Sequence, residues 1–237
     1  MKHWIWAFGI LMVLGCREKV KEAQIVEEET AVSVEVLDSV SQVEKKKFKS
    51  FEGLADTTFV RLADFSDGFA YDLRYATENN FTESQIYDCA RCYLRKETAE
   101  AIVRAQQQLR AQGLGLKLFD CYRPKPYQQR LWDKVPNPDY VAPPSEGSMH
   151  SRGAAVDLTI VDANGNELDM GTPYDFFGRE AHYNYSRLPG KVIANRRLLR
   201  KTMESVGLNG IRTEWWHFSY QKKSFPLEDW VWKCPAN

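Results

Sequence analysis

The sequence predicts an α+β domain in which helices flank a small antiparallel sheet. Two segments, residues 96–112 and 195–206, carry apolar side chains at helical spacing, and residues 155–161 alternate apolar and polar side chains as a strand does. No regular βαβ repeat, which is typical of parallel sheets, is present. Residues 51–237 are long enough to form one such domain with a sizeable core.

Residues 1–16 are predicted to be an export signal. Lys2 is positively charged, residues 4–14 are apolar, and Gly15 precedes Cys16. The apolar run is too short to cross a bilayer of about 30 Å as a helix. The segment resembles a bacterial lipoprotein signal, in which Cys16 carries the lipid; the alternative is an ordinary signal with a coincidental cysteine. We expect an exported lipoprotein that is attached to a membrane and faces the periplasm or the cell exterior.

Residues 17–50 are predicted to be a flexible, solvated tether. They contain runs of like charge at residues 27–29 and 45–47, which repel one another and bury little surface. Over the whole chain, 32 Lys and Arg balance 32 Asp and Glu, so no global field recruits nucleic acid. The expected partner is a small molecule, and the sequence implies no protein partner.

The two predicted helices end at glycines. Residues 96–112 precede Gly113, and residues 195–206 precede Gly207, with Asn195 in the N-cap position of the second helix.

The predicted strands are residues 114–119 and 155–161. A third helix is predicted between them, starting at Pro124 and Pro126, because proline is tolerated in a first turn. In the second strand, Asp157 lies on the less apolar face and is therefore available to a cleft.

Four cysteines remain beyond Cys16, and their even number in an exported chain favours disulfides over a metal site. Three pairings are possible and the sequence does not rank them. The four are Cys89, Cys92, Cys121 and Cys234.

Two short segments point to a metal-dependent hydrolase. One holds His150 and Asp157, which a straight strand would separate by about 23 Å, so the chain must bend, and Gly153 is the expected bend. The other holds Glu214 and His217, with Glu214 expected in a loop or bulge that enters the strand of His217. Two imidazoles and one carboxylate would bind one zinc ion with its fourth position open to water, as catalytic sites do. A glutamate that is not a ligand would act as general base.

These residues resemble the zinc D-alanyl-D-alanine dipeptidases, the VanX-like family. The pattern Ser-x-His-x-x-Gly-x-Ala-x-Asp falls on residues 148–157, and Glu-x-x-His falls on residues 214–217. Asp-x-Tyr-Arg-Pro at residues 120–124 and Asp-Phe at residues 175–176 are more specific to the dipeptidase branch. The matches keep the family's order over residues 72–217.

The resemblance implies a hedgehog/D,D-peptidase-type zinc fold and one zinc ion per chain. It assigns His150, Asp157 and His217 as ligands, Glu214 as general base, and Arg123 as the group that stabilises the oxyanion. It also places four residues in the dipeptide pocket, where a carboxylate receives the substrate ammonium: Tyr75, Asp120, Ser148 and Asp175.

Two further positions carry expectations. Cys121 replaces the small residue usual in the family, so a disulfide is expected to brace the loop of Arg123; Cys89 and Cys92, which precede the first predicted helix, could partner Cys121 or Cys234. His182 is interpreted as a surface histidine, with a place beside the metal site as the alternative.

The leading hypothesis is zinc-dependent hydrolysis of D-alanyl-D-alanine, or a close D,D-dipeptide, to free amino acids in cell-wall peptide turnover. The first alternative is a D,D- or L,D-carboxypeptidase or endopeptidase that acts on longer peptidoglycan stems. The second is a non-catalytic binding module that zinc stabilises.

Overall fold

The computed structural model describes residues 47–138 and 140–235, so the predicted signal with Cys16 and nearly all of the predicted tether lie outside the described residues. Within the described ranges, no helix is both long and apolar enough to cross a membrane. Lys49, from the end of the predicted tether, donates its backbone N–H to the carbonyl of Asp64 at 2.9 Å.

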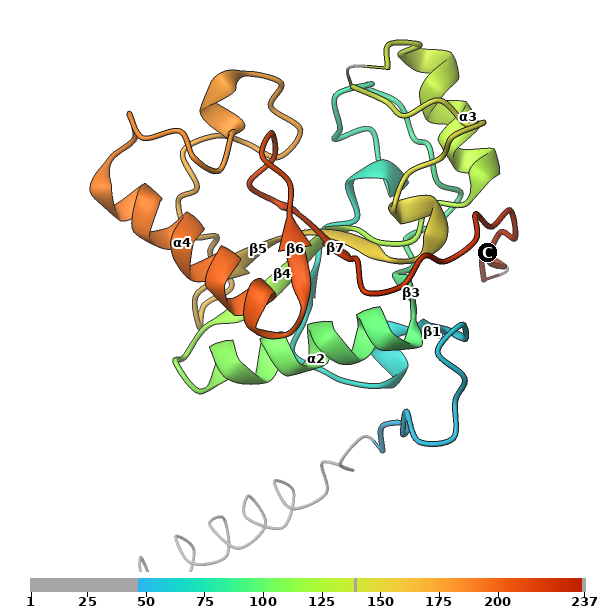
Figure 1. Cartoon of the computed structure of the whole chain (residues 1–237), viewed down its shortest axis with the longest axis horizontal. Coiled ribbons are helices and arrows are strands. Elements are labelled where there is room, and N and C mark those ends of the chain that lie inside the picture. The colour runs from blue at the N-terminus through green and yellow to red at the C-terminus, as the bar shows by residue number, and fades with distance from the viewer. Residues whose placement is uncertain (1–46, 139, 236–237) are drawn as a thin grey trace, which may run out of the picture. The chain divides into compact units, whose positions relative to one another are not determined.

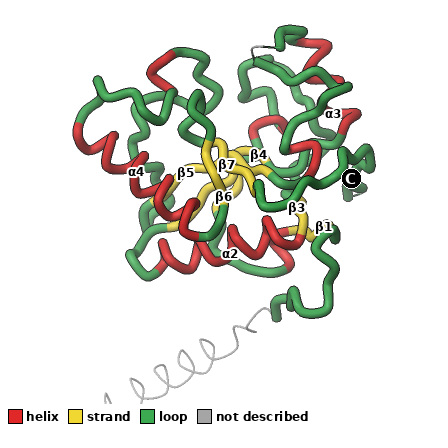
Figure 2. The backbone as a smooth tube through the Cα atoms, in the orientation of Figure 1, coloured by secondary structure: helices red, strands yellow, loops and turns green. Residues whose placement is uncertain are grey.

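A five-stranded sheet lies at the centre of the domain (Figures 1 and 2). β2 and β4 are parallel at one edge, and the other neighbours are antiparallel, which confirms the predicted α+β class with this one parallel pair added. In spatial order the strands are β2 (Ala70–Tyr71), β4 (Gly115–Asp120), β5 (Ala155–Val161), β7 (His217–Tyr220) and β6 (Leu208–Gly210).

Two strands form a separate antiparallel ribbon. β1 (Phe59–Arg61) pairs with β3 (Tyr93–Arg95), and β3 runs directly into the first described helix. The backbone N–H of Arg95 donates to the carbonyl of Gly153 at 2.9 Å. The ribbon is therefore fastened to the bend that precedes β5.

Helices α2 (Lys96–Arg110) and α4 (Gly190–Ser205) contact each other and cover one face of the sheet (Figure 1). The apolar face of β5 packs into the same core, as its alternation predicts. The residues on its other face, which include Asp157 and Thr159, are also buried. The sequence pattern did not predict this burial.

Helix α4 begins earlier than predicted. It starts at Gly190, directly after Pro189, and Asn195 is inside the helix rather than at its N-cap. The side-chain amide of Asn195 instead donates to the carbonyl of Asp169 at 2.9 Å. Gly207 follows the helix end with φ +92°, as expected of a glycine in that position.

Helix α3 (Lys125–Lys134) starts after Pro124 with Pro126 in its first turn, as predicted. It buries Tyr127 and Leu131 in a second, smaller core that also holds Trp232 near the C-terminus.

The four cysteines form two disulfides, Cys89–Cys234 and Cys92–Cys121. The preference for disulfides over a metal site is confirmed, and the pairing that the sequence left open is now assigned. Cys121 directly follows β4 and lies two residues before Arg123, so the second disulfide is joined to the loop of Arg123.

Candidate active site

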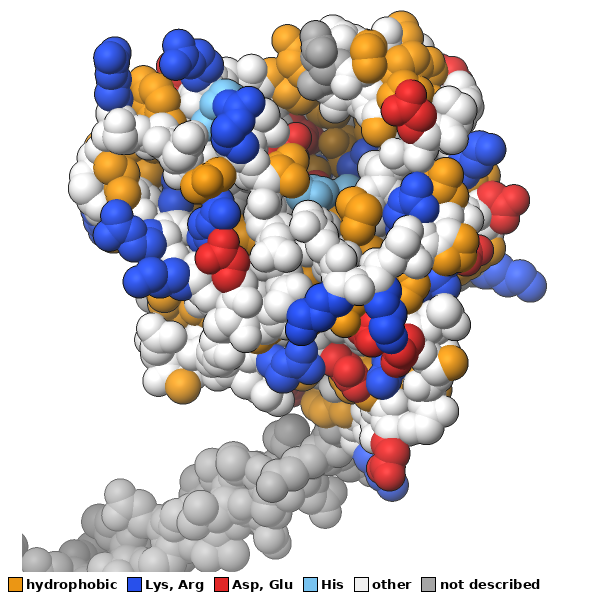
Figure 3. All heavy atoms as spheres, viewed as in Figure 1, with side chains coloured by type: hydrophobic (Ala, Val, Ile, Leu, Met, Phe, Trp, Pro, Cys, Tyr) orange, Lys and Arg blue, Asp and Glu red, His pale blue; other side chains and the backbone are white. Residues whose placement is uncertain are grey.

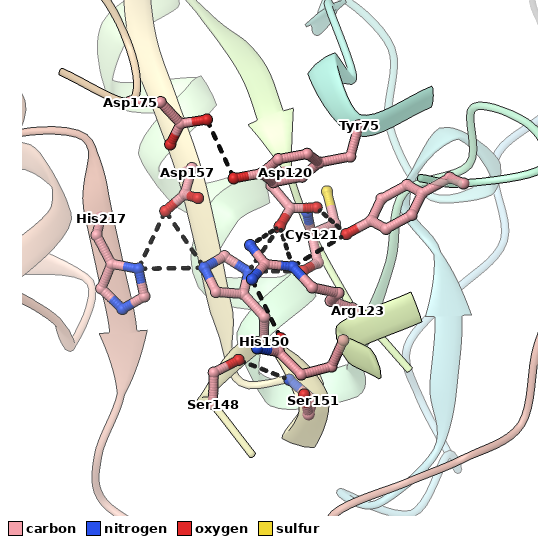
Figure 4. Close-up of polar contacts among 12 residues, drawn as sticks. Tyr75, Asp120, Cys121, Arg123, Ser148, His150, Ser151, Asp157, Asp175 and His217 are labelled. Atoms are coloured by element: carbon pink, nitrogen blue, oxygen red, sulfur yellow. Dashed lines mark hydrogen bonds and ion pairs between the residues drawn. The ribbon is translucent and has the colours of Figure 1, made fainter. Parts of the chain in front are cut away.

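Asp120, Asp157 and His217 lie in one row across three neighbouring strands. In the sheet register, Asp157 of β5 faces Asp120 of β4 on one side and His217 of β7 on the other. His150 enters from the 3-10 helix His150–Arg152, which Gly153 ends with φ +68°. The predicted bend at Gly153 therefore turns the chain so that His150 and Asp157 meet (Figure 4).

The three predicted ligands form a compact group. Nε2 of His150, Nδ1 of His217 and Oδ1 of Asp157 are 3.0, 3.1 and 3.3 Å apart in pairs. A tetrahedral zinc ion with ligands at about 2.0–2.1 Å would separate its donor atoms by about 3.3 Å. The donor set and its spacing thus fit a divalent metal ion. The residues His150, His217 and Asp157 are 4%, 8% and 3% exposed, so a site here would be sheltered from solvent.

Neighbouring groups fix the orientation of two of these side chains. Nδ1 of His150 lies 2.7 Å from the carbonyl of Cys121, so it is the donor and Nε2 faces the group with its lone pair. The hydroxyl of Tyr174 donates to Oδ2 of Asp157 at 3.0 Å. Burial raises the pKa of Asp157, but His150 and His217 outweigh this and hold it below its usual range.

Glu214 lies in the loop between β6 and β7, three residues before His217, as predicted. Trp215 and Trp216 follow it and are buried; the indole of Trp215 donates to the Thr172 hydroxyl at 2.9 Å, which holds the loop in place. The Glu214 carboxylate makes no hydrogen bond within the described residues, and burial raises its pKa above the usual value, opposed by the nearby charge of His217. A carboxylate with these properties can accept and release a proton.

Arg123 is held by Asp120 in a buried ion pair. Nε and Nη2 of Arg123 donate to Oδ2 of Asp120 at 3.1 and 2.6 Å, and Nη1 donates to Gln128 at 3.2 Å. The guanidinium also lies over the ring of Tyr75, 4.8 Å from its centroid. Burial opposes the charge of Arg123, but Asp120 outweighs it and raises the pKa of the guanidinium.

Asp120 has a different surrounding from the one expected of a substrate-binding carboxylate. It is fully buried, and its second oxygen, Oδ1, accepts from the Tyr87 hydroxyl at 2.6 Å and from the backbone N–H of Cys121 at 2.9 Å. Both oxygens are occupied by donors of this chain. Within the described residues, Asp120 therefore holds Arg123 with one oxygen and is itself held through the other, while its predicted contact with a substrate ammonium stays a prediction.

Asp175 retains one free side. The Tyr75 hydroxyl donates to its Oδ2 at 3.0 Å, and no other hydrogen bond reaches its side chain among the described residues (Figure 4). Burial, reinforced by the charge of Asp157, raises the pKa of Asp175 well above the usual range. A desolvated carboxylate with a single neutral donor would be stabilised by a cation beside it.

Ser148 and His182 lie apart from this group of contacts. The hydroxyl oxygen of Ser148 accepts the backbone N–H of Ser151 at 3.3 Å, which supports the loop of His150; serine side chains commonly make such contacts in turns. His182 is half-buried, and Nη1 of Arg212 donates to its Nδ1 at 3.2 Å. This pairing with Arg212 agrees with the interpretation of His182 as a surface residue.

Figure 3 shows a hollow in the face of the domain, with histidine and acidic side chains at its floor and hydrophobic side chains along its rim. Two tyrosines that contact carboxylates of the site could not be identified from the sequence. Tyr87 and Tyr174 reach Asp120 and Asp157 from 33 and 17 residues away, and no local motif marks them.

Known proteins are similar to this chain over most of the described domain. The family described as D-ala-D-ala dipeptidase, peptidase M15, matches residues 55–233. A D-alanyl-D-alanine dipeptidase of Escherichia coli is 40% identical over 73% of this chain and 91% of its own length. One from Enterococcus faecium is 32% identical over 71% of this chain and 94% of its own.

A solved structure of a VanY D,D-pentapeptidase mutant with Zn(II) covers 54% of this chain and 73% of its own, at 18% identity and a TM-score of 0.37. That similarity is too distant to bear on the site, whereas the family match and the two relatives extend across it. The chain belongs to the D-Ala-D-Ala dipeptidase family of M15 peptidases.

Proposed function

We propose that this protein hydrolyses D-alanyl-D-alanine, or a close D,D-dipeptide, to free amino acids with the help of one zinc ion. The observation that carries the proposal is the group of three donor atoms from His150, Asp157 and His217. The carboxylate of Glu214 interacts with the charges of this group and has no hydrogen-bond partner among the described residues. Family membership supports the choice of substrate, because the relatives from E. coli and E. faecium are named D-alanyl-D-alanine dipeptidases.

His150, Asp157 and His217 would hold the zinc ion. The spacing of their donor atoms fits a single ion. A bound zinc ion supplies a Lewis acid that polarises a carbonyl and lowers the pKa of water. Three side chains leave a coordination position open, as hydrolysis requires.

Glu214 is the proposed general base. It would take a proton from the water that attacks the scissile carbonyl, and return it to the amine nitrogen when the C–N bond breaks. Its raised pKa suits both steps, since the protonated form becomes accessible nearer neutral pH.

Arg123 is proposed to stabilise the negative charge that develops on the carbonyl oxygen. Asp120, Gln128 and the ring of Tyr75 fix the guanidinium before substrate arrives. Preorganised donors of this kind contribute about 3–4 kcal/mol to lowering a barrier.

Asp175 is proposed to bind the substrate ammonium, oriented by the hydroxyl of Tyr75. Its unpaired carboxylate would gain a counter-charge from a free amino terminus, and an acylated amine could not supply one. This distinguishes a dipeptidase from an enzyme that cuts longer stems. Ser148 is proposed to line the same dipeptide pocket.

We also propose that the protein lies outside the cytoplasm and is attached to a membrane by a lipid on Cys16. It is supported by the apolar segment that ends in Gly15 and Cys16. Turnover of cell-wall peptides would be the corresponding role.

The proposal is tested by supplying the zinc-loaded full chain with D-alanyl-D-alanine and with its N-acetyl derivative, and by quantifying released D-alanine. We expect cleavage of the free dipeptide and at least about 100-fold slower cleavage of the acetylated one, since a buried charge is then left unpaired. Preference for the acetylated compound would support the carboxypeptidase alternative. A folded, zinc-loaded chain that cleaves neither would support the binding module.

A further inference from the structure

The backbone of Cys121 makes hydrogen bonds with two residues of the site, His150 and Asp120. Its carbonyl oxygen accepts from Nδ1 of His150 at 2.7 Å, and its N–H donates to Oδ1 of Asp120 at 2.9 Å. Asp120 in turn holds Arg123. One residue therefore orients a proposed metal ligand and, through Asp120, the proposed oxyanion-stabilising group (Figure 4).

Strand pairing does not hold Cys121 in place. β4 ends at Asp120, and its register with β5 is already irregular between Leu118 and Asp120. Beyond this point, the backbone N–H of Tyr122 donates to the carbonyl of Tyr93 at 2.9 Å, and the disulfide joins Cys121 to Cys92.

Cys92 is itself firmly placed. Its carbonyl accepts the backbone N–H of Leu62 at 3.0 Å, and it directly precedes β3 of the ribbon. Both cysteines are buried, at 4% and 1% exposure for Cys92 and Cys121. The disulfide thus transfers the rigidity of the ribbon to the segment that leaves the sheet at Cys121.

We propose that the Cys92–Cys121 disulfide is a positioning element of the active site. It holds the peptide groups of Cys121 so that His150 presents Nε2 to the metal position and Asp120 keeps Arg123 in place. The inference rests on the proposed function for the role of His150 as a zinc ligand, for the role of Arg123 and for the readout of turnover. Loss of a group that hydrogen-bonds to a metal ligand and orients it commonly changes metal affinity or activity by about 10- to 100-fold.

The second disulfide provides a matched control. Cys89–Cys234 spans a sequence separation of 145 residues against 29 for Cys92–Cys121, so it constrains the unfolded chain at least as strongly. The carbonyl of Cys89 accepts from the indole of Trp232, and neither cysteine of this pair contacts His150, Asp120 or Arg123 through a described hydrogen bond. Its removal should lower stability without moving the site.

The test compares Cys92→Ala/Cys121→Ala with Cys89→Ala/Cys234→Ala in the full chain. For each we would measure the melting temperature, the zinc dissociation constant by competition with a chelator, the absorption spectrum of the cobalt-loaded protein, and kcat and KM for D-alanyl-D-alanine. We expect the first pair to weaken zinc binding and lower kcat by about tenfold or more, with little change in KM and an altered cobalt spectrum. The control should lose melting temperature and keep the other four values.

Equal effects of both pairs on zinc affinity and kcat, or no effect of the first pair on either, would overturn the inference. If the alanine pair does not fold, Cys92→Val/Cys121→Ala refills most of the buried volume and gives the same comparison. If wild type binds zinc but cleaves no dipeptide, the proposed function fails, while zinc affinity and the cobalt spectrum still decide the role of the disulfide.

Discussion

Replacing Asp120 with Asn removes the charge that holds Arg123 and leaves the shape of the side chain almost unchanged. Both oxygens of Asp120 accept from donors: Arg123 donates twice to Oδ2, and Tyr87 and the backbone of Cys121 donate to Oδ1. An amide has one oxygen and one NH₂ group, so on one side it must point a donor at a donor. Arg123 as a residue is only 8% exposed, so its guanidinium is then left buried without its counter-charge.

Breaking a buried ion pair by removing one partner costs about 3–5 kcal/mol of unfolding free energy. At about 2–4 °C per kcal/mol for a domain of this size, Asp120→Asn should melt about 6–20 °C below wild type. kcat should also fall by about 10²-fold or more, because Arg123 loses its orientation toward the developing charge.

Thermal unfolding followed by circular dichroism and steady-state kinetics on D-alanyl-D-alanine would measure both effects. Asp67→Asn is the matched control, because Asp67 pairs with Arg110 at 3.1 Å on an exposed surface. Exposed pairs contribute little to stability, so the control should behave as wild type. If Asp120→Asn kept the melting temperature and kcat of wild type, Asp120 would not be the residue that holds Arg123 in place.

Three further predictions concern other parts of the site. Asp175→Asn should raise KM by about 10- to 100-fold, because the substrate loses a charged hydrogen-bond partner. The same substitution should raise the melting temperature at neutral pH, since it removes a desolvated carboxylate. A lower melting temperature with unchanged KM would contradict this. Because burial raises the pKa of Glu214 and a base acts when deprotonated, kcat/KM should be lost as pH falls through a value above 4.5, and a pH–rate profile still flat below that value would argue against it. Gly153→Ala should cost about 1–3 kcal/mol in urea unfolding, because φ is +68° and the new Cβ would lie 2.4 Å from Cε1 of Phe59; wild-type stability would disprove the strain.

Local patterns predicted the elements that depend on neighbouring residues. The apolar stripe of α2, the alternation of β5, the prolines at the start of α3 and the bend at Gly153 all appear as expected. They could be predicted because periodicity, proline geometry and glycine at positive φ act within a few residues. The predicted start of α4 was wrong. Asn195 is a residue type that favours the N-cap position, but Pro189 also permits a helix to start, and the helix extends back to Pro189.

The contacts that orient the site could not be predicted in this way. These contacts join residues that are distant in the sequence: they involve the hydroxyl groups of Tyr87 and Tyr174 and the carbonyl of Cys121. Tyrosines and backbone carbonyls are too common to mark a site. Asp120 shows the limit most clearly. Its place beside Arg123 in the sequence does not reveal its full burial or its two sets of donors, because these depend on residues that the fold brings together.

In the proposed mechanism, Glu214 moves the proton in a hydrolysis that His150, Asp157 and His217 support by holding zinc. The direct measurement is the turnover of D-alanyl-D-alanine by Glu214→Gln protein, with its zinc content determined on the same sample. We predict zinc content equal to that of wild type and kcat lower by about 10²- to 10⁴-fold, the usual contribution of a general base. Wild-type turnover by a zinc-loaded Glu214→Gln protein would contradict the account.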